Sequence, residues 1–110
     1  MTRFLGLIKL SAEEASRMVQ DGPRSRRDFI DLLVREGGGT VEGLWLTNVG
    51  DWDLVCVVNM EQSTSARGAA ATLARRAARL TDDERWIELA DVDRVADALE
   101  QMSGSAPSGC

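Results

Sequence analysis

Carboxylates, arginines and three tryptophans are the side chains that any chemistry of this chain would have to use. The 110 residues include no histidine and no tyrosine, and cysteine occurs only as Cys56 and Cys110. A Ser-His-Asp triad, a Cys-His pair and a histidine-ligated zinc or haem all need an imidazole, so these sites are excluded. A general base would therefore be a carboxylate, and we expect neither a metal nor a cofactor.

The segment Gly50-Asp51-Trp52-Asp53 holds the main candidate residues for a site. Asp53 lies beside an aromatic residue at the start of a strand-like run, where its carboxylate could act as a catalytic group or orient a ligand. Gly50 and Trp52 are candidate ligand-binding residues next to it. A structural interpretation stays open, in which Gly50 supplies a positive φ to a turn and Trp52 anchors the strand in the core.

Trp45 and Trp86 are two further candidate ligand-binding residues. Both could line one apolar cavity and stack on a flat ligand. Each also lies in a strand-like run, so each could instead belong to the hydrophobic core.

Composition bears on the cellular compartment of the protein and on the classes of partner that it can bind. Its formal net charge of -5 opposes binding to nucleic-acid phosphates, so we expect no nucleic-acid partner. No apolar run approaches the roughly 20 residues of a membrane-spanning helix, and the stretch 4–10 is too short for a signal peptide. The two cysteines do not resemble a disulfide framework, which agrees with a reducing compartment. These features predict a cytoplasmic protein with no membrane partner, in which Cys56 is a core residue.

Hydrophobic periodicity predicts four strands and the helices between them. The strand-like runs cover residues 4–10, 40–47, 52–60 and 84–90. Ser11 followed by Glu14 forms a capping-box pattern for a helical turn, and apolar spacing predicts a helix over 24–36. A turn around Gly50 joins the second and third strands in a β-hairpin.

Two more helices follow the hairpin. An alanine-rich helix begins at a cap among Ser63, Thr64 and Ser65 and reaches about Leu80. Its apolar stripe consists of Ala66, Ala70, Leu73, Ala77 and Leu80. Because these side chains are small, we expect the stripe to lie close against a sheet. Asp91 then caps a last helix, whose apolar residues are Val92, Val95, Leu99 and Met102.

This order predicts an α+β protein of ferredoxin-like βαββαβ topology, with a four-stranded antiparallel sheet and both main helices on one face. We assign residues 1–90 to this domain, 91–102 to an added C-terminal helix and 103–110 to a disordered tail. A chain of this size has room for one hydrophobic core.

The predicted strands are apolar on both sides, unlike strands of a sheet with one face in water. In the run 52–60, Trp52 and Leu54 share one side while Val55 and Val57 occupy the other. Helices cover one side, and we expect the sheet of a second copy to cover the other, giving a homodimeric α/β barrel or a higher homo-oligomer. The alternative is a monomer in which the last helix covers the open side.

Three segments of the sequence are similar to a known protein family: residues 7–11, 38–47 and 50–58. Together they resemble the GYD domain family, which is named for a Gly/aromatic/Asp motif. Gly50, Trp52 and Asp53 match that motif, and Trp52 stands at the aromatic position where the family that it resembles has tyrosine. The resemblance implies a small ferredoxin-like protein of largely unassigned function.

Three hypotheses of function remain open. The first is a binding module, an oligomeric α/β barrel that holds a small organic ligand in an apolar pocket between sheet and helices or between subunits. The second is a cofactor-independent enzyme of the monooxygenase, isomerase or cyclase type that uses a carboxylate such as Asp53, an idea that rests on fold analogy. The third is a structural interaction protein with no ligand.

Overall fold

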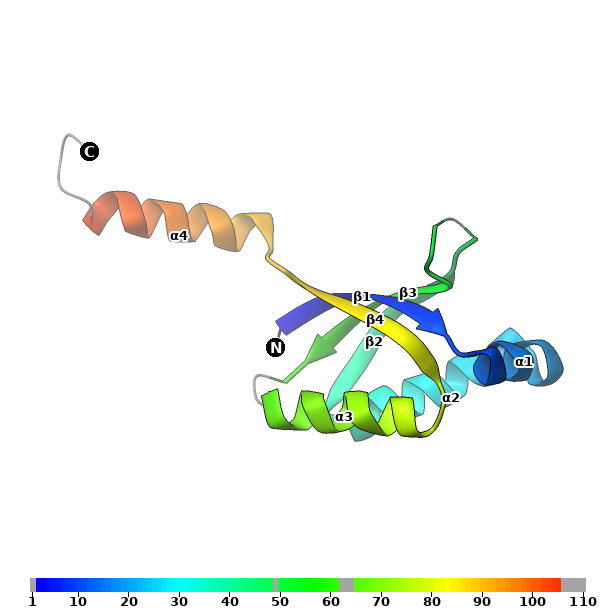
Figure 1. Cartoon of the computed structure of the whole chain (residues 1–110). Helices are drawn as coiled ribbons and strands as arrows, with labels where there is room; N and C mark the ends of the chain where they lie inside the picture. Colours follow the sequence, from blue (N-terminus) through cyan, green and yellow to red (C-terminus); the bar gives the residue numbers. More distant parts are fainter. Residues whose placement is uncertain (1, 49, 62–64, 106–110) are drawn as a thin grey trace.

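The computed structural model describes residues 2–48, 50–61 and 65–105. The strands are β1 (Thr2–Leu10), β2 (Gly39–Leu46), β3 (Leu54–Met60) and β4 (Thr81–Leu89). The helices are α1 (Ala12–Asp21), α2 (Pro23–Glu36), α3 (Ser65–Ala77) and α4 (Val92–Ser105). The order confirms a ferredoxin-like α+β protein in which the first crossover contains two helices and α4 follows the last strand (Figure 1).

One antiparallel sheet contains the strands in the order β2-β3-β1-β4. Gly6 of the central strand β1 is in register with Cys56 of β3 and with Trp86 of β4. A bulge between Val41 and Gly43 interrupts the pairing of the edge strand β2 with β3. Because side chains alternate between the two faces of a sheet, this register decides which residues of different strands share a face.

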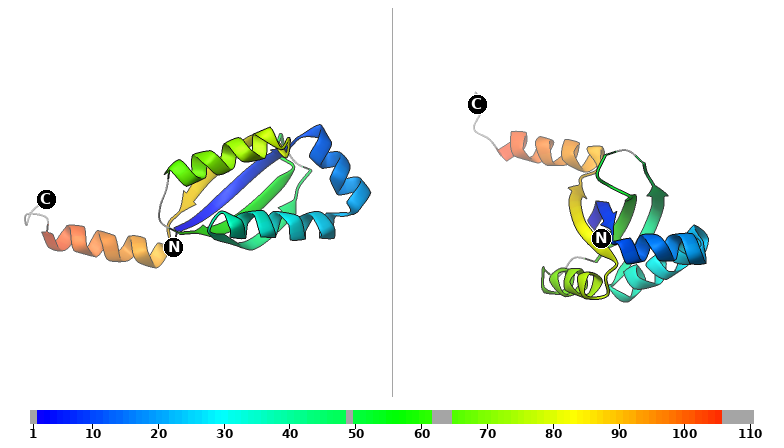
Figure 2. Two further views of the ribbon diagram at one scale, coloured as in Figure 1. Left: turned by 90° about the horizontal axis from the view of Figure 1, so that it is seen from below. Right: turned by 45° about the vertical axis from the view of Figure 1, so that its right-hand side comes forward.

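Helices α1, α2 and α3 lie on one side of the sheet (Figure 1, Figure 2). We call this sheet surface the helix face and the opposite surface the open face. The buried core lies on the helix face and consists of Ile8, Met18, Leu54, Cys56 and Val58. Partly buried side chains pack against this core, among them Ile30, Val34, Val41 and Leu44. The core therefore holds β1 and β3 against α1 and α2.

The predicted turn after Ser11 is a complete helix, α1. Ser11 caps it as predicted, because its hydroxyl accepts a hydrogen bond from the Glu14 backbone N–H at 3.0 Å. Met18 lies on the buried side of α1 and is 8% exposed, so the core stabilises the full helix. Gly22, with φ of 91°, and Pro23 separate α1 from α2, since proline can begin a helix but cannot continue one.

Helix α3 turns a different side to the sheet from the one predicted. Leu73 of the predicted stripe is 69% exposed. The exposed alanines of the same stripe are Ala66, Ala70 and Ala77. Arg75 is half-buried instead, and it binds Glu84 of β4. Alanine gains little from burial, so this ion pair sets the rotation of the helix. The candidate caps Ser63 and Thr64 lie outside the described residues.

Helix α4 leaves the sheet soon after β4 and projects away from it (Figure 1). Asp91 caps it as predicted, because the Asp93 backbone N–H donates to Asp91 Oδ1 at 2.9 Å. The helix continues to Ser105, beyond its predicted end at Met102. The remaining residues of the predicted tail, 106–110, lie outside the described residues.

Candidate functional site

The open face is apolar along all four strands. The register places on it Leu5, Leu7, Trp45, Val55, Val57, Ile87 and Leu89. Trp45 is 57% exposed and Ile87 is 42% exposed. Within residues 2–48, 50–61 and 65–105, no helix covers this face (Figure 2). These side chains therefore give the open face a continuous apolar surface.

Polar side chains close one end of the open face. Arg3 Nη2 donates to Glu42 Oε1 at 2.9 Å, and Asn59 Nδ2 donates to the same oxygen at 2.5 Å. The hydrogen bond from Asn59, followed by that from Arg3, holds the pKa of Glu42 below its usual value. Because Arg3 and Glu42 are well exposed, their ion pair contributes little to stability.

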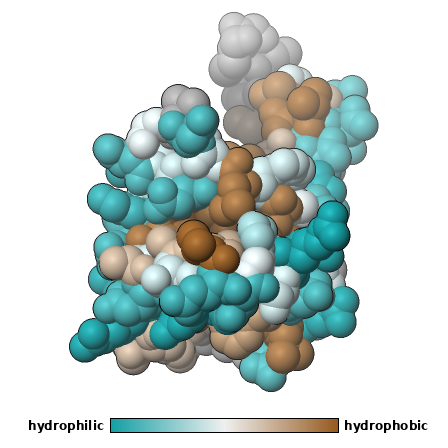
Figure 3. Space-filling view, turned by 90° about the vertical axis from the view of Figure 1, so that its right-hand side faces the viewer, coloured by the Kyte–Doolittle hydropathy of each residue, from teal (hydrophilic) through white to brown (hydrophobic). Residues whose placement is uncertain are grey.

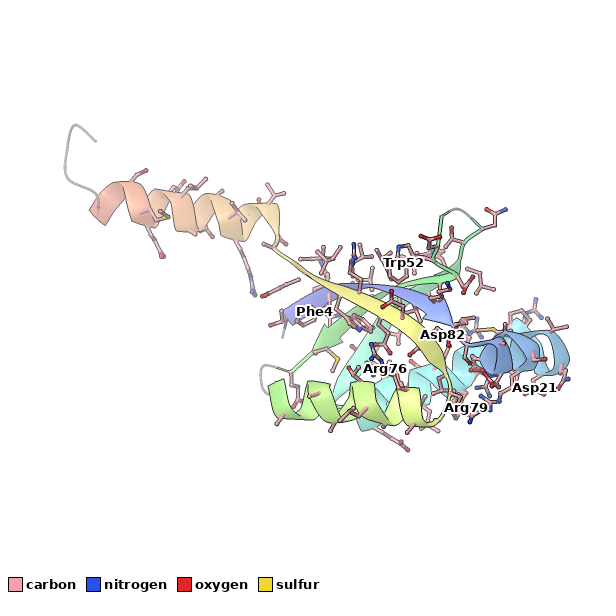
Figure 4. All side chains as sticks on the ribbon, in the orientation of Figure 1. Phe4, Asp21, Trp52, Arg76, Arg79 and Asp82 are labelled. Carbon is pink, nitrogen blue, oxygen red and sulfur yellow. The ribbon has the colours of Figure 1, made fainter. Side chains whose placement is uncertain are left out.

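Trp52 and Arg85 meet at the other end of the open face. The guanidinium carbon of Arg85 lies 5.8 Å from the centroid of the Trp52 ring. Arg85 is in register with Leu7, so Trp52 lies on the open side, away from the helices (Figure 4). The prediction that Trp52 shares the side of Leu54 is therefore wrong, because the chain bends at Asp53 before β3 begins. An arginine beside an aromatic ring is suited to an organic anion.

Trp45 and Trp86 lie on opposite faces of the sheet. Trp45 is in register with Val55 on the open face, and a Cβ atom on Gly43 would overlap its ring. Trp86 lies on the helix face, where a Cβ atom on Gly6 would overlap its ring. The hypothesis that both rings line one cavity is therefore wrong. Each ring covers a glycine of its own or the neighbouring strand.

Asp53 fastens the hairpin to β1. Its Oδ2 accepts a hydrogen bond from the Leu10 backbone N–H at 2.9 Å, and its own N–H donates to the Ile8 carbonyl at 2.9 Å. Its carbonyl accepts from the Thr47 backbone N–H at 2.9 Å. Gly50 has φ of 76°, which confirms the positive φ expected in this turn. These contacts are structural, and a catalytic role of Asp53 stays a prediction.

Glu84 is the centre of a polar cluster on the helix face. Arg75 donates to both of its oxygens, from Nε at 2.9 Å and from Nη2 at 2.7 Å. The Thr81 hydroxyl donates at 2.7 Å and Trp86 Nε1 at 2.9 Å. Burial raises the pKa of Glu84, but these hydrogen bonds and the charge of Arg75 outweigh it and hold the pKa below its usual value. All acceptor positions are used, so we assign this cluster to structure rather than to a ligand.

The sequence pattern gave no sign of this cluster, because Glu84 follows two aspartates and resembles part of a charged turn. Its cross-strand setting becomes visible only once β1 and β4 are in register. Trp86 therefore serves Glu84 as a hydrogen-bond donor, and its place in a ligand site stays a prediction.

A second buried carboxylate joins α1 to α2. Glu14 is 1% exposed, and its two oxygens lie 2.5 Å and 2.6 Å from Arg26 Nη2. The Arg26 guanidinium also lies over the ring of Phe29, 4.3 Å from its centroid. Arg26 is thus the partner of the most buried charge among the described residues.

Cys56 is buried between β1 and β2, as the sequence predicts. Burial raises the pKa of its thiol to about 11, so the reactive thiolate is scarce at neutral pH.

In the described part of the chain, histidine, cysteine and acidic side chains nowhere gather into a group that could hold a metal ion. No helix among the described residues is long and apolar enough to cross a membrane.

A groove of about 390 Å³ lies between α2 and the edge strand β2. Arg27, Asp28 and Asp31 line it from α2, and Leu44 and Trp45 line it from β2. This lining is more charged than the apolar pocket that was predicted. From the end of the molecule at which α1 lies, hydrophilic side chains surround a few apolar ones (Figure 3).

The sequence matches no family model and no curated protein. The resemblance to the GYD family is therefore unconfirmed. Among solved structures, the fold is similar to the C-terminal domain of the MgtC protein from Mycobacterium tuberculosis, with a TM-score of 0.58 and 12% identity. The match covers 81% of this chain and 88% of that chain. At this identity the likeness supports the small α+β fold alone.

Proposed function

We propose that this protein is a homodimeric binding module, in which a second copy covers the open face and a small organic anion binds beside Trp52 and Arg85. One observation carries the proposal: the open face is apolar in all four strands, and none of the described helices covers it. Burying such a surface against another chain removes it from water and stabilises the pair.

The end of the open face at which Trp52 and Arg85 lie supports the choice of ligand. Arg85 supplies a fixed positive charge, and the Trp52 ring beside it supplies a flat apolar surface. Lys9 stands two residues from Leu7 on the same face of β1 and adds a second cation. Their combination suits a molecule with an apolar ring and a carboxylate.

The proposal agrees with the remaining expectations for this chain. A buried free thiol such as Cys56 fits a protein of the reducing cytoplasm. Membership of the GYD family, on the evidence of the motif at Gly50, Trp52 and Asp53, would also fit a small binding domain.

Native mass spectrometry and light scattering of the full chain test the dimer, and tryptophan fluorescence tests the ligand site. We expect a dimer at micromolar concentration, and we expect 2-naphthoate to change the fluorescence in a saturable way. Arg85→Gln should weaken naphthoate binding about tenfold, because it removes the paired charge. Arg76→Gln, on exposed α3, is the matched control and should bind as the parent does. A monomer at all concentrations would refute the dimer, and equal affinity of the two variants would refute the site.

A further inference from the structure

Helix α4 carries an apolar stripe whose side chains are exposed in the part of the chain that the structure describes. The stripe residues and their exposed fractions are Val92 at 81%, Val95 at 44%, Leu99 at 57% and Met102 at 65%. They are spaced by three, four and three residues, which is the spacing that places side chains along one side of a helix for packing. A stripe of this kind in water costs free energy unless another surface covers it.

The cap of α4 directs the helix away from its own sheet. Asp91 holds the first turn twice, since its Oδ1 accepts from the Asp93 N–H at 2.9 Å and its carbonyl accepts from the Val95 N–H at 3.0 Å. Only Ala90 and Asp91 separate α4 from β4, so the helix axis follows from the direction of the strand. Figure 2 shows that α4 extends beyond the end of the sheet. To reach its own open face, the chain would have to break this cap and reverse.

The stripe and the open face match in length. From Val92 to Met102 the stripe rises roughly 15 Å, at 1.5 Å per residue. Four neighbouring strands spaced by about 4.8 Å span roughly 14 Å between the outer two. One helix laid across the strands can therefore place an apolar side chain over each strand of the open face.

The two surfaces also carry opposite charge. The charged residues of the open face are Arg3, Lys9, Arg85, Glu42 and Asp83, with cations in excess. The charged residues of the cap and helix are Asp91, Asp93, Asp97, Glu100 and Arg94, with carboxylates in excess. This complementarity favours contact between α4 and the open face over contact between two copies of α4, whose like charges repel.

We infer that α4 is an exchanged arm, which lies across the open face of the second copy while the partner's arm lies across the open face of the first. The inference rests on the proposed dimer and names the element that covers the face. Exchange of two identical arms is reciprocal, so it closes a two-fold symmetric pair.

The test uses the full chain with single substitutions on the arm and on the face. Leu99→Glu should raise the dimer dissociation constant about 100-fold or more, because both arms of the pair lose a buried leucine. Gln101→Glu places the same added charge on the other side of α4 and should leave the constant within about threefold. Val57→Glu, at the centre of the open face, should weaken the dimer as Leu99→Glu does. If that variant loses its circular dichroism spectrum, Ile87→Glu on the edge strand replaces it.

Mixing the two disrupted chains identifies the exchange. In a mixed pair, the intact arm of the Val57→Glu chain meets the intact face of the Leu99→Glu chain. The mixture should therefore form heterodimers at a concentration at which each variant alone is monomeric. Native mass spectrometry resolves the heterodimer by its mass. If Leu99→Glu stays dimeric while Val57→Glu does not, the two sheets pair directly. That result would overturn the exchange of α4 but would agree with the proposed dimer. If Val57→Glu stays dimeric, or no heterodimer forms, the arm does not lie on the open face. A monomeric parent chain overturns the dimer itself.

Discussion

Replacing Arg26 by methionine tests the buried ion pair that joins α1 to α2. The substitution keeps most of the packing over Phe29 but removes the charge that faces Glu14. Glu14 is 1% exposed and the Arg26 side chain is 11% exposed, so water does not replace the lost partner. The variant Arg26→Met leaves a buried carboxylate without a counter-charge.

Removal of one member of a buried ion pair costs about 3–5 kcal/mol. Small domains have a total unfolding free energy of about 5–15 kcal/mol, so the variant should lose a large part of its stability. A domain of about this size loses roughly 4 °C or more of Tm per kcal/mol, which predicts a fall of at least about 12 °C. Glu14→Met combined with Arg26→Met should recover most of the loss, because two apolar side chains can replace a buried ion pair at little cost.

Urea unfolding followed by tryptophan fluorescence, at one fixed protein concentration, measures these free energies. The exposed pair of Arg35 and Asp31 supplies the control, and Arg35→Met should change stability by less than about 1 kcal/mol. The ion pair does not stabilise the junction of α1 and α2 if Arg26→Met is as mild as Arg35→Met, or if the losses from Arg26→Met and Glu14→Met simply add in the double variant.

Three further predictions concern the helix face. The pKa of Glu84 is lower in the folded protein than its usual value of 4.5. Its contribution to stability is therefore complete above pH 4.5 and is lost as the pH falls through the lower folded pKa. Glu84→Gln should make the fall of stability at acid pH less steep. Gly6→Ala should destabilise the fold by about 1–3 kcal/mol in urea unfolding, because its Cβ would overlap the Trp86 ring. Cys56, with a thiol pKa of about 11, should react with iodoacetamide at pH 8 far more slowly in the folded than in the unfolded chain.

Each of these predictions has a control within the chain. Glu88→Gln removes an exposed carboxylate of β4, and an acid limb flattened equally by both changes would contradict the role of Glu84. Gly68→Ala adds a methyl group to α3 with no atom within 4 Å, so it should not destabilise, and an equal loss from Gly6→Ala and Gly68→Ala would exclude steric crowding. Labelling of Cys56 is measured in a Cys110→Ser chain, and equal rates in the folded and unfolded states would refute its burial.

Local signals in the sequence were sufficient for most of the fold. The four strands, the hairpin turn at Gly50 and the caps at Ser11 and Asp91 are each encoded by neighbouring residues, and the structure confirms them. Short-range patterns work here because turn geometry and capping depend on residues only a few positions apart. The apolar character of both sides of the strands is also a local pattern, and the register confirms an apolar face opposite the helices. Its cover by a second copy stays a prediction.

The parts that could not be predicted depend on contacts between distant segments. Trp45 and Trp86 could not be assigned to opposite faces without the strand register, which includes the bulge after Val41. Trp52 departs from strand alternation because hydrogen bonds with β1 and with Thr47 hold Asp53 in place. The partner of Glu14 lies in another helix, and no spacing rule connects residues across such a break.

The bulge in β2 also bears on how far assembly can proceed. An edge strand with regular spacing can add strands from further copies without limit, which leads to fibres. The bulge at Glu42 breaks the regular row of donors and acceptors on one edge of this sheet, and the many charged side chains of β4 guard the other edge. Growth from either edge is disfavoured, so the proposed dimer would use the open face and α4 for contact rather than the edges of the sheet. An assembly made in that way would be finite, because the exchange of two identical arms closes a pair.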